Sequence, residues 1–263
     1  MTLSKSVIAL ALTSGMIFSS VVAAADEQLR ELSLPASSLT GLNAEVGAGG
    51  FTLKTSADTD TVTVTALIGH QGDREPELKL EQRGNDAFLV AKFPANTSWF
   101  GKSPYIDITV TVPANFNLEL EDGSGDIHIS GLKGNIKVKD GSGNIELMGG
   151  NTVSIEDGSG DIELTDIVGT LSITDGSGDI DISNVGGNTH IKDGSGNIQA
   201  SDINANIEIN DGSGNIDVSR VAAKVEITDG SGNIKVSDAE SLVLHETGSG
   251  NVTSNNIRSG VTL

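Results

Sequence analysis

The sequence predicts an all-β fold, a single-chain parallel β-solenoid with about 18 residues per coil and a right-handed winding preferred to a left-handed one. The first observation is a string, Asp-Gly-Ser-Gly-(Asp/Asn)-Ile, that recurs along the second half of the chain. The second is its spacing, because successive copies lie 18 residues apart with a single step of 17. The third is a period-two alternation of apolar and polar residues after each copy. Copies begin at Asp122, Asp140, Asp157, Asp175, Asp193, Asp211 and Asp229, with a variant at Thr247.

Each unit reads as turn, strand, turn and strand, which is one coil. In the first strand of a unit, Ile127 and Ile129 share one face while His128 lies opposite. Stacking of the coils aligns such apolar positions in columns, so Ile180 and Ile216 are expected to point into the core. No coil can bury its own apolar face, and stability must therefore come from neighbouring coils and from capped ends.

A string of antiparallel hairpins is the alternative, since glycine turns between short alternating strands are also typical of hairpins. Hairpins pair strands within a repeat. The near-constant spacing, with the same residue at the same position of each copy, instead favours the stacking of equivalent strands from successive repeats. The one short step spans Gly149-Gly150, where glycine can tighten a corner.

The N-terminus predicts export. Lys5 precedes a short apolar run from Val7 to Phe18, and small residues follow at Ala23 and Ala25. A membrane anchor is disfavoured, because a spanning helix needs about 20 apolar residues. We therefore assign residues 1–25 to a signal peptide, 26–115 to irregular β-structure forming N-terminal coils or a cap, and 116–263 to eight regular repeats with a C-terminal cap. The mature protein is expected to be periplasmic or extracellular.

The amino-acid composition disfavours some classes of binding partner. The chain has 36 acidic and 16 basic residues, a balance that disfavours binding to nucleic acid or to anionic lipid surfaces. No segment of the mature chain is apolar enough to span a membrane, and the absence of cysteine excludes disulfides. An envelope component, a protein or a glycan remains as the partner, and self-association is also open.

The leader, the strand from Tyr105 to Pro113 that ends in Val-Pro, and the Gly-Ser-Gly-(Asp/Asn)-Ile coils together resemble a known family. Over roughly residues 39–260 the chain is similar to the bacterial "putative adhesin" domains of unknown function. This resemblance implies a parallel β-solenoid in exported or envelope-associated proteins, and it brings no catalytic residues. The coils also resemble the calcium-binding nonapeptide repeats of secreted toxins, but Ile127 and its equivalents stand where those repeats carry the ligating Asp.

Catalytic chemistry has little support. The four histidines, His70, His128, His190 and His245, share no motif, and the serine of each Gly-Ser-Gly turn has no partnering histidine. Every coil offers carboxylates, so no pair is singled out for sugar hydrolysis. We predict a non-catalytic protein with no cofactor that presents a binding or scaffold surface; an enzyme acting on an extended polysaccharide is the alternative.

Two kinds of binding site nevertheless remain as candidates, a calcium site and a contact surface. Stacked aspartates repel one another, so their column needs turn hydrogen bonds with some protonation, or bound Ca²⁺. The Trp99-Phe100 pair is a candidate contact surface, or else it packs over an open end of the solenoid. A fixed count of 18 places Leu242 and Leu244 outward, with Val243 and His245 inward, so the two leucines form a second contact surface or are covered by residues 255–263. The calcium candidates are Asp122, Asp140, Asp157, Asp175, Asp193, Asp211 and Asp229, with help from Asp126 and Asn144.

Overall fold

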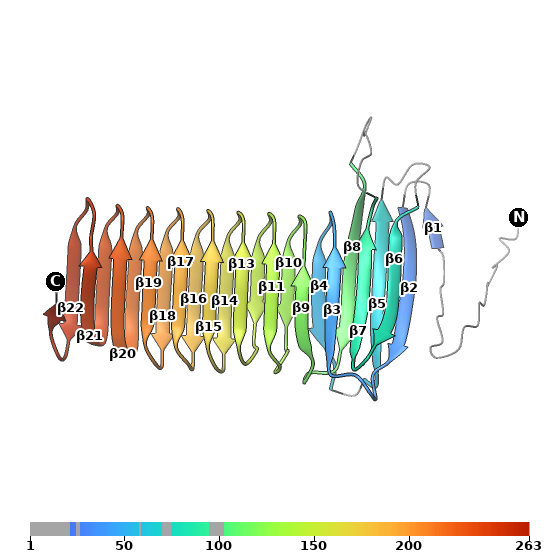
Figure 1. Cartoon of the computed structure of the whole chain (residues 1–263), viewed down its shortest axis with the longest axis horizontal. Coiled ribbons are helices and arrows are strands. Elements are labelled where there is room, and N and C mark those ends of the chain that lie inside the picture. Colours follow the sequence, from blue (N-terminus) through green and yellow to red (C-terminus); the bar gives the residue numbers. More distant parts are fainter. Residues whose placement is uncertain (1–21, 25–26, 58, 70–74, 95–102, 263) are drawn as a thin grey trace, which may run out of the picture.

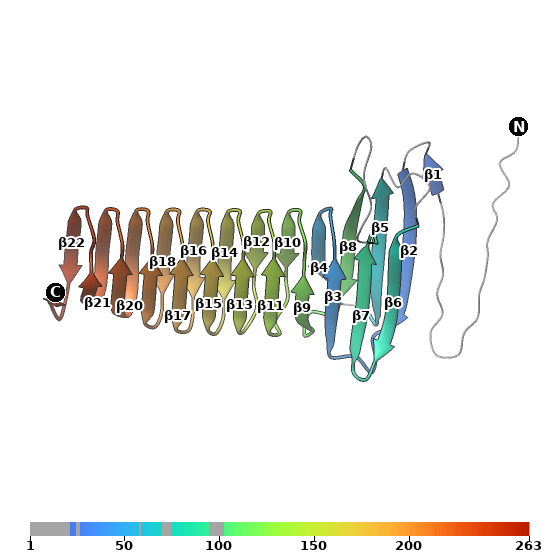
Figure 2. The same cartoon turned by 45° about the horizontal axis from the view of Figure 1, so that its top comes forward.

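The chain forms a rod of stacked β-strands, shown by a computed structural model in two views (Figures 1 and 2). The structure describes residues 22–24, 27–57, 59–69, 75–94 and 103–262. All elements within these ranges are strands, and none of them contains a helix that is long and apolar enough to cross a membrane. The predicted all-β parallel solenoid with about 18 residues per coil is thereby confirmed.

Two sheets face each other along the rod, and consecutive strands alternate between them. Each strand pairs in parallel with the equivalent strand of the next coil, as Ile127 does with Ile145. One sheet contains β4 (Phe51–Thr55), β10 (Ile127–Ser130), β12 (Ile145–Met148), β14 (Ile162–Ile167), β16 (Ile180–Val185) and β18 (Ile198–Ile203). The other contains β3 (Gly41–Val46), β9 (Asn117–Glu121), β11 (Ile136–Asp140), β13 (Val153–Asp157), β15 (Leu171–Asp175), β17 (Thr189–Asp193) and β19 (Ile207–Asp211).

Toward the C-terminal end, two long strands pass from one sheet into the other. They are β20 (Ile216–Asp229) and β21 (Ile234–Glu246), which pair with each other in parallel. The last coil consists of β22 (Val252–Ile257) and β23 (Val261–Thr262), and both of these pair with β21.

The N-terminal end is built differently, with antiparallel strands laid against the first parallel coil. β3 and β4 already follow the parallel register of the repeats, so the stacking extends N-terminal to residue 116. Beyond them lie β7 (Asp86–Lys92) and β8 (Tyr105–Val112), which pair in parallel with β3 and β4. The antiparallel strands are β1 (Val22–Ala24), β2 (Glu27–Pro35), β5 (Thr61–Gly69) and β6 (Glu77–Arg83).

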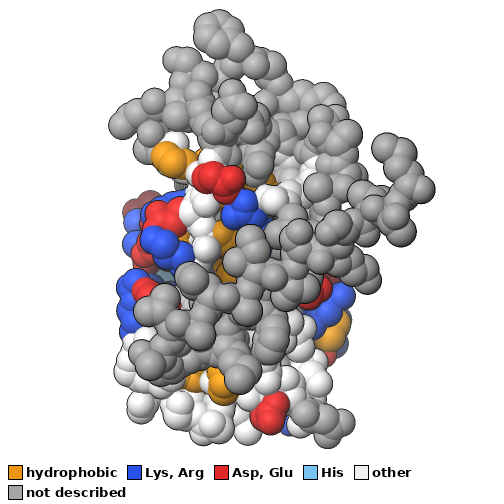
Figure 3. Space-filling view, turned by 90° about the vertical axis from the view of Figure 1, so that its right-hand side faces the viewer, with side chains coloured by type: hydrophobic (Ala, Val, Ile, Leu, Met, Phe, Trp, Pro, Cys, Tyr) orange, Lys and Arg blue, Asp and Glu red, His pale blue; other side chains and the backbone are white. Residues whose placement is uncertain are grey.

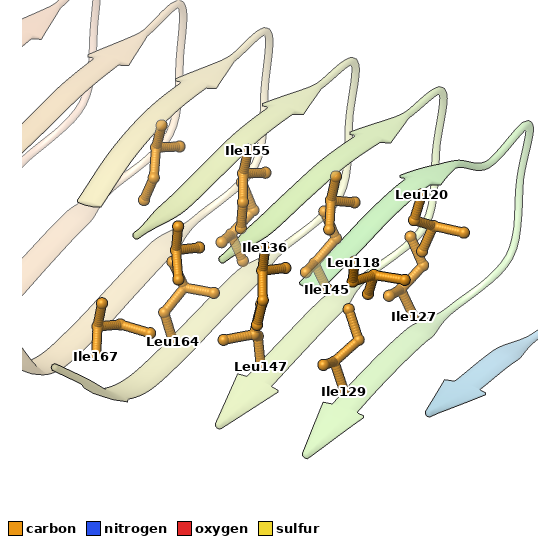
Figure 4. Packing of buried hydrophobic residues seen from close by; sticks show 14 of the residues in the cluster. Leu118, Leu120, Ile127, Ile129, Ile136, Ile145, Leu147, Ile155, Leu164 and Ile167 are labelled. Carbon is orange, nitrogen blue, oxygen red and sulfur yellow. The ribbon is translucent and has the colours of Figure 1, made fainter. Parts of the chain in front are cut away.

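Columns of Ile, Leu and Val fill the space between the sheets. Figure 4 shows Ile127, Ile129 and Leu147 directed toward side chains of the opposite sheet, such as Leu118 and Leu120. The inward residues are almost fully buried, and Ile180 and Ile216 each keep 1% of their surface exposed. The predicted orientation of both isoleucines is confirmed.

A left-handed residue at one corner of most coils directs the following apolar side chain inward. Asp166 has φ 62° and Asn184 has φ 57°, and Ile167 and Val185 follow them in the core. Asp and Asn tolerate this conformation better than other non-glycine residues. The short coil differs, because Gly149 takes the corner position with φ 103° and Gly150 stands where the other coils carry the apolar residue; a Cβ on Gly150 would lie 2.9 Å from side-chain atoms of Ile136 and Val153.

The predicted orientation of the Leu242 region is wrong. Leu242 and Leu244 are 0% and 3% exposed, whereas Val243 is half-buried and His245 is exposed. The pairing of β20 with β21 shifts by one residue between Val221 and Lys224 and shifts back after Ile227. A fixed count of 18 therefore misassigns the intervening residues, and the two leucines continue the core columns.

Candidate functional site

Seven carboxyl groups form one buried column along the solenoid. Asp140 ends β11 on the same inner face as Ile136 and Val138, and it pairs in register with Asp157 of the next coil. The same pairing continues coil by coil, which confirms the predicted stacking. We call this set the aspartate column: Asp122, Asp140, Asp157, Asp175, Asp193, Asp211 and Asp229, with exposed fractions of 1% to 8%.

The two oxygens of each carboxyl group have different surroundings. In six of the seven members, Oδ1 accepts a hydrogen bond from the backbone N–H of the serine two residues later, at 2.9 to 3.3 Å. This is the predicted turn hydrogen bond. In all seven members, Oδ2 is buried without a hydrogen-bond partner. A buried carboxylate oxygen without a partner is costly, so it favours the protonated form of the group.

The acidity of the column follows from this burial. Burial, and secondly the neighbouring Asp140, raise the pKa of Asp122 to about 7. Burial raises the pKa of Asp157, Asp193 and Asp211 to about 6, with adjacent members of the column adding to the effect. Burial also raises the pKa values of Asp140, Asp175 and Asp229.

The column does not provide the donor set that a calcium ion requires. Ca²⁺ takes six to eight oxygen ligands. Each member of the column has one unpartnered oxygen, with the exception of Asp140, and the neighbouring inward side chains are apolar. In the part of the chain that the structure describes, no three acidic, histidine or cysteine side chains converge to hold a metal ion.

The predicted helpers, Asp126 and Asn144, belong to a separate ladder on the surface. Asp126 Oδ1 accepts a hydrogen bond from the backbone N–H of Asn144 at 3.1 Å, and Asn144 Oδ1 accepts one from Asp161 at 3.0 Å. Similar bonds continue through the later coils. The ladder therefore fastens one turn to the next and leaves these side chains exposed.

Histidines show surface ion pairs in place of catalytic contacts. His128 Nδ1 lies 2.9 Å from Glu146 of the next coil, and His190 Nδ1 lies 3.6 Å from Glu208. His245 Nε2 lies 3.6 Å from Glu226. Each of these three imidazoles is about half exposed. His70 lies outside the described residues.

A polar groove crosses the sheet where the N-terminal strands meet the first repeats. It consists of two hollows of about 540 and 290 Å³, which share Asn43 and Glu119. Its walls come from six adjacent strands, β6, β7, β3, β9, β11 and β13, so residues distant in sequence meet there. We call it the junction groove, and its polar lining is Thr40, Asn43, Glu45, Arg83, Asp86, Asn117, Glu119, Glu121, Asn135, Lys137, Thr152 and Ser154.

The side chains of the junction groove are already ordered by one another. Lys137 Nζ lies 3.0 Å from Glu119, and Lys92 pairs with Glu45. The Arg83 guanidinium lies over the Phe88 ring, 4.7 Å from its centroid. Figure 3, an end-on view from the N-terminal side, shows charges of both signs around the rim of the molecule. The groove thus offers amides, hydroxyls and paired charges on a rigid sheet.

Of the two contact surfaces predicted from the sequence, the structure describes the residues of only one. Trp99 and Phe100 lie outside the described residues. Leu242 and Leu244 are core residues, so they form no exposed patch. The junction groove was not predictable from the sequence, because its lining residues belong to no motif.

Comparison with known proteins places this geometry in a family. The pattern of the Toastrack DUF4097 family matches residues 11–261. The chain belongs to this family. No curated protein matches the chain.

Solved structures have a similar arrangement. A "putative lipid binding protein" from Parabacteroides distasonis is 20% identical, with a TM-score of 0.53, over 91% of this chain and 97% of that chain. A "putative adhesin" from Bacteroides fragilis is 16% identical, with a TM-score of 0.50, over 86% and 97%. At these identities the likeness demonstrates a shared fold.

Proposed function

We propose that this Toastrack protein is a non-catalytic, exported protein of the bacterial envelope or the secreted fraction, and that it binds its partner in the junction groove. The observation that carries the proposal is the groove itself, which gathers neutral polar and charged side chains from six strands onto one surface of the sheet. Such a lining suits a ligand rich in hydroxyl and amide groups, as a glycan or an extended peptide is.

The carboxylates of the groove favour binding over sugar hydrolysis. A glycosidase needs a carboxylic acid whose surroundings raise its pKa, beside a second carboxylate. Glu45 and Glu119 are instead exposed and paired with Lys92 and Lys137. This arrangement supports the proposal of a binding surface.

Lipid binding, which the name of one structural neighbour suggests for that protein, receives less support in this chain. Lipid chains need an enclosed apolar cavity. Here the inward side chains fill the space between the sheets, and the two hollows described above are polar and open. Export itself rests on the N-terminal segment of residues 1–25, and periplasmic and extracellular locations are both compatible with it.

The test uses the mature chain from residue 26 on a glycan array and in a pull-down from an envelope fraction. Asn43→Arg places a long side chain at the point that both hollows share, and it should abolish capture of the partner. Asn210→Arg is the matched control, because Asn210 is exposed on β19 of the same sheet, away from the groove. Undiminished capture by the Asn43→Arg variant would show that the partner binds elsewhere.

A further inference from the structure

The aspartate column contains more buried acid than its hydrogen bonds can accommodate. Its turn hydrogen bonds satisfy one oxygen of most members, and one oxygen of every member has no partner. The next carboxyl group along the column is one strand spacing away, about 4.8 Å between backbones. A protonated carboxyl group is a donor, and an ionised one is an acceptor. One proton between two neighbours therefore satisfies an oxygen on each.

A proton meets the requirements of this site where a metal ion does not. It needs only two oxygens, and it adds no volume among the close-packed side chains of the core. The charged groups that affect the column are all acidic, including Asp126 beside Asp140, Asp161 beside Asp175 and Asp179 beside Asp193. Among the residues described, no Lys, Arg or His contributes to the acidity of a column member.

We propose that the aspartate column is a proton-binding site, in which carboxyl groups keep their protons in mildly acidic solution, where exposed aspartates are ionised, and donate them to ionised neighbours along the rod. If no two adjacent members are ionised, at least three of the seven are protonated. Folding then takes up protons, and the folded rod carries less negative charge than the sequence indicates.

The direction of the pH effect follows from the raised pKa values. The unfolded chain holds these carboxyl groups near the ordinary value of 3.8, and the folded chain holds several of them at about 6 or 7. Between those values the folded state binds more protons than the unfolded state, so stability increases as the pH falls from 8 toward 4 and is lost as the pH rises through 6 to 7. Most proteins that contain ion-paired carboxylates show the opposite dependence.

The experiment measures urea unfolding of the protein between pH 8 and pH 4.5 at constant ionic strength. Each proton taken up on folding changes the folding constant about tenfold per pH unit. We expect the constant to rise at least about tenfold per unit on going from pH 7.5 to pH 5.5. A constant that is unchanged or that falls over this range would overturn the proposal, and this result depends on no variant.

Two substitutions test whether the pH dependence of stability comes from the aspartate column. Asp193→Asn keeps the shape and can still donate to a neighbouring carboxylate, so it should raise the melting temperature at pH 8 and reduce proton uptake by about one. Asp181→Asn alters an exposed acid on the outer face of β16, which does not act on the column, and should leave proton uptake unchanged. Equal proton uptake in Asp193→Asn and the unaltered protein would contradict the proposal.

Infrared spectroscopy and metal addition provide independent readouts. The band of protonated carboxyl groups should be present at pH 5.5 and weaker in Asp193→Asn. Melting at pH 8 in Ca²⁺, in chelator and in Na⁺ of matched ionic strength should give equal midpoints. A midpoint that Ca²⁺ raises in the unaltered protein and not in Asp193→Asn would show that the column holds metal in place of protons.

Discussion

Replacing Ile180 by alanine should lower the free energy of unfolding by about 3–4 kcal/mol. Ile180 is 1% exposed and lies in register between Ile162 and Ile198. Loss of three carbon atoms removes about 2.4 kcal/mol of transfer free energy. The backbone ladders on both sides fix the spacing of the coils, so the cavity cannot close and adds a further penalty.

Urea unfolding followed by circular dichroism measures this change. Asp181→Ala, which alters the exposed neighbour on the outer face, is the matched control and should change stability by less than about 0.5 kcal/mol. Ile180→Asp should prevent cooperative folding, because it buries a charge with no partner. If Ile180→Ala costs less than about 1 kcal/mol, or no more than the control, the assignment of inner and outer faces is refuted.

Three further substitutions test particular positions. Gly196→Ala should destabilise the fold severely, because Gly196 has φ 149° and its new Cβ would lie 1.8 Å from the Gly178 carbonyl oxygen. Gly50→Ala is the control and should be tolerated, because the nearest atom would lie 3.6 Å away, and equal melting temperatures of the two variants would contradict this prediction. Thr189→Val should stabilise by about 1 kcal/mol in urea, because the Thr189 hydroxyl is buried without a partner; a loss of stability would show that the hydroxyl is bonded. Leu242→Asp should lower the melting temperature far more than Val243→Asp, and the reverse order would restore the register that a fixed count predicts.

Much of the fold is predictable from the sequence because a repeat constrains every copy at once. Ile127, Ile145 and their equivalents must stack like on like once the spacing is constant, and the period of two then assigns inner and outer faces. The corner at Gly149-Gly150 was predictable for a similar reason, since a missing residue needs the conformations that glycine allows.

The wrong or missing predictions concern places where the 18-residue repeat is interrupted or where a residue is buried that is usually exposed. The misassignment of Leu242 and Leu244 came from two compensating register shifts, which leave the spacing from Asp229 to Thr247 unchanged. The depth of the aspartate column was also missed, because Asp is rarely buried without a partner and its place in a turn motif suggested exposure. The junction groove depends on contacts between β7, β3 and β9, which no local pattern encodes.

Uniform repetition also explains why a specific site is expected at the junction. In a regular rod each coil presents nearly the same surface, so a ligand that recognised one coil would bind at several registers with equal affinity. A unique register requires a surface that occurs once. The junction of the antiparallel strands with the first repeats is such a place, and the junction groove there brings together amides, hydroxyls and charges of both signs. The repeats then act as a rigid support that holds this surface away from the C-terminal end of the rod (Figure 1).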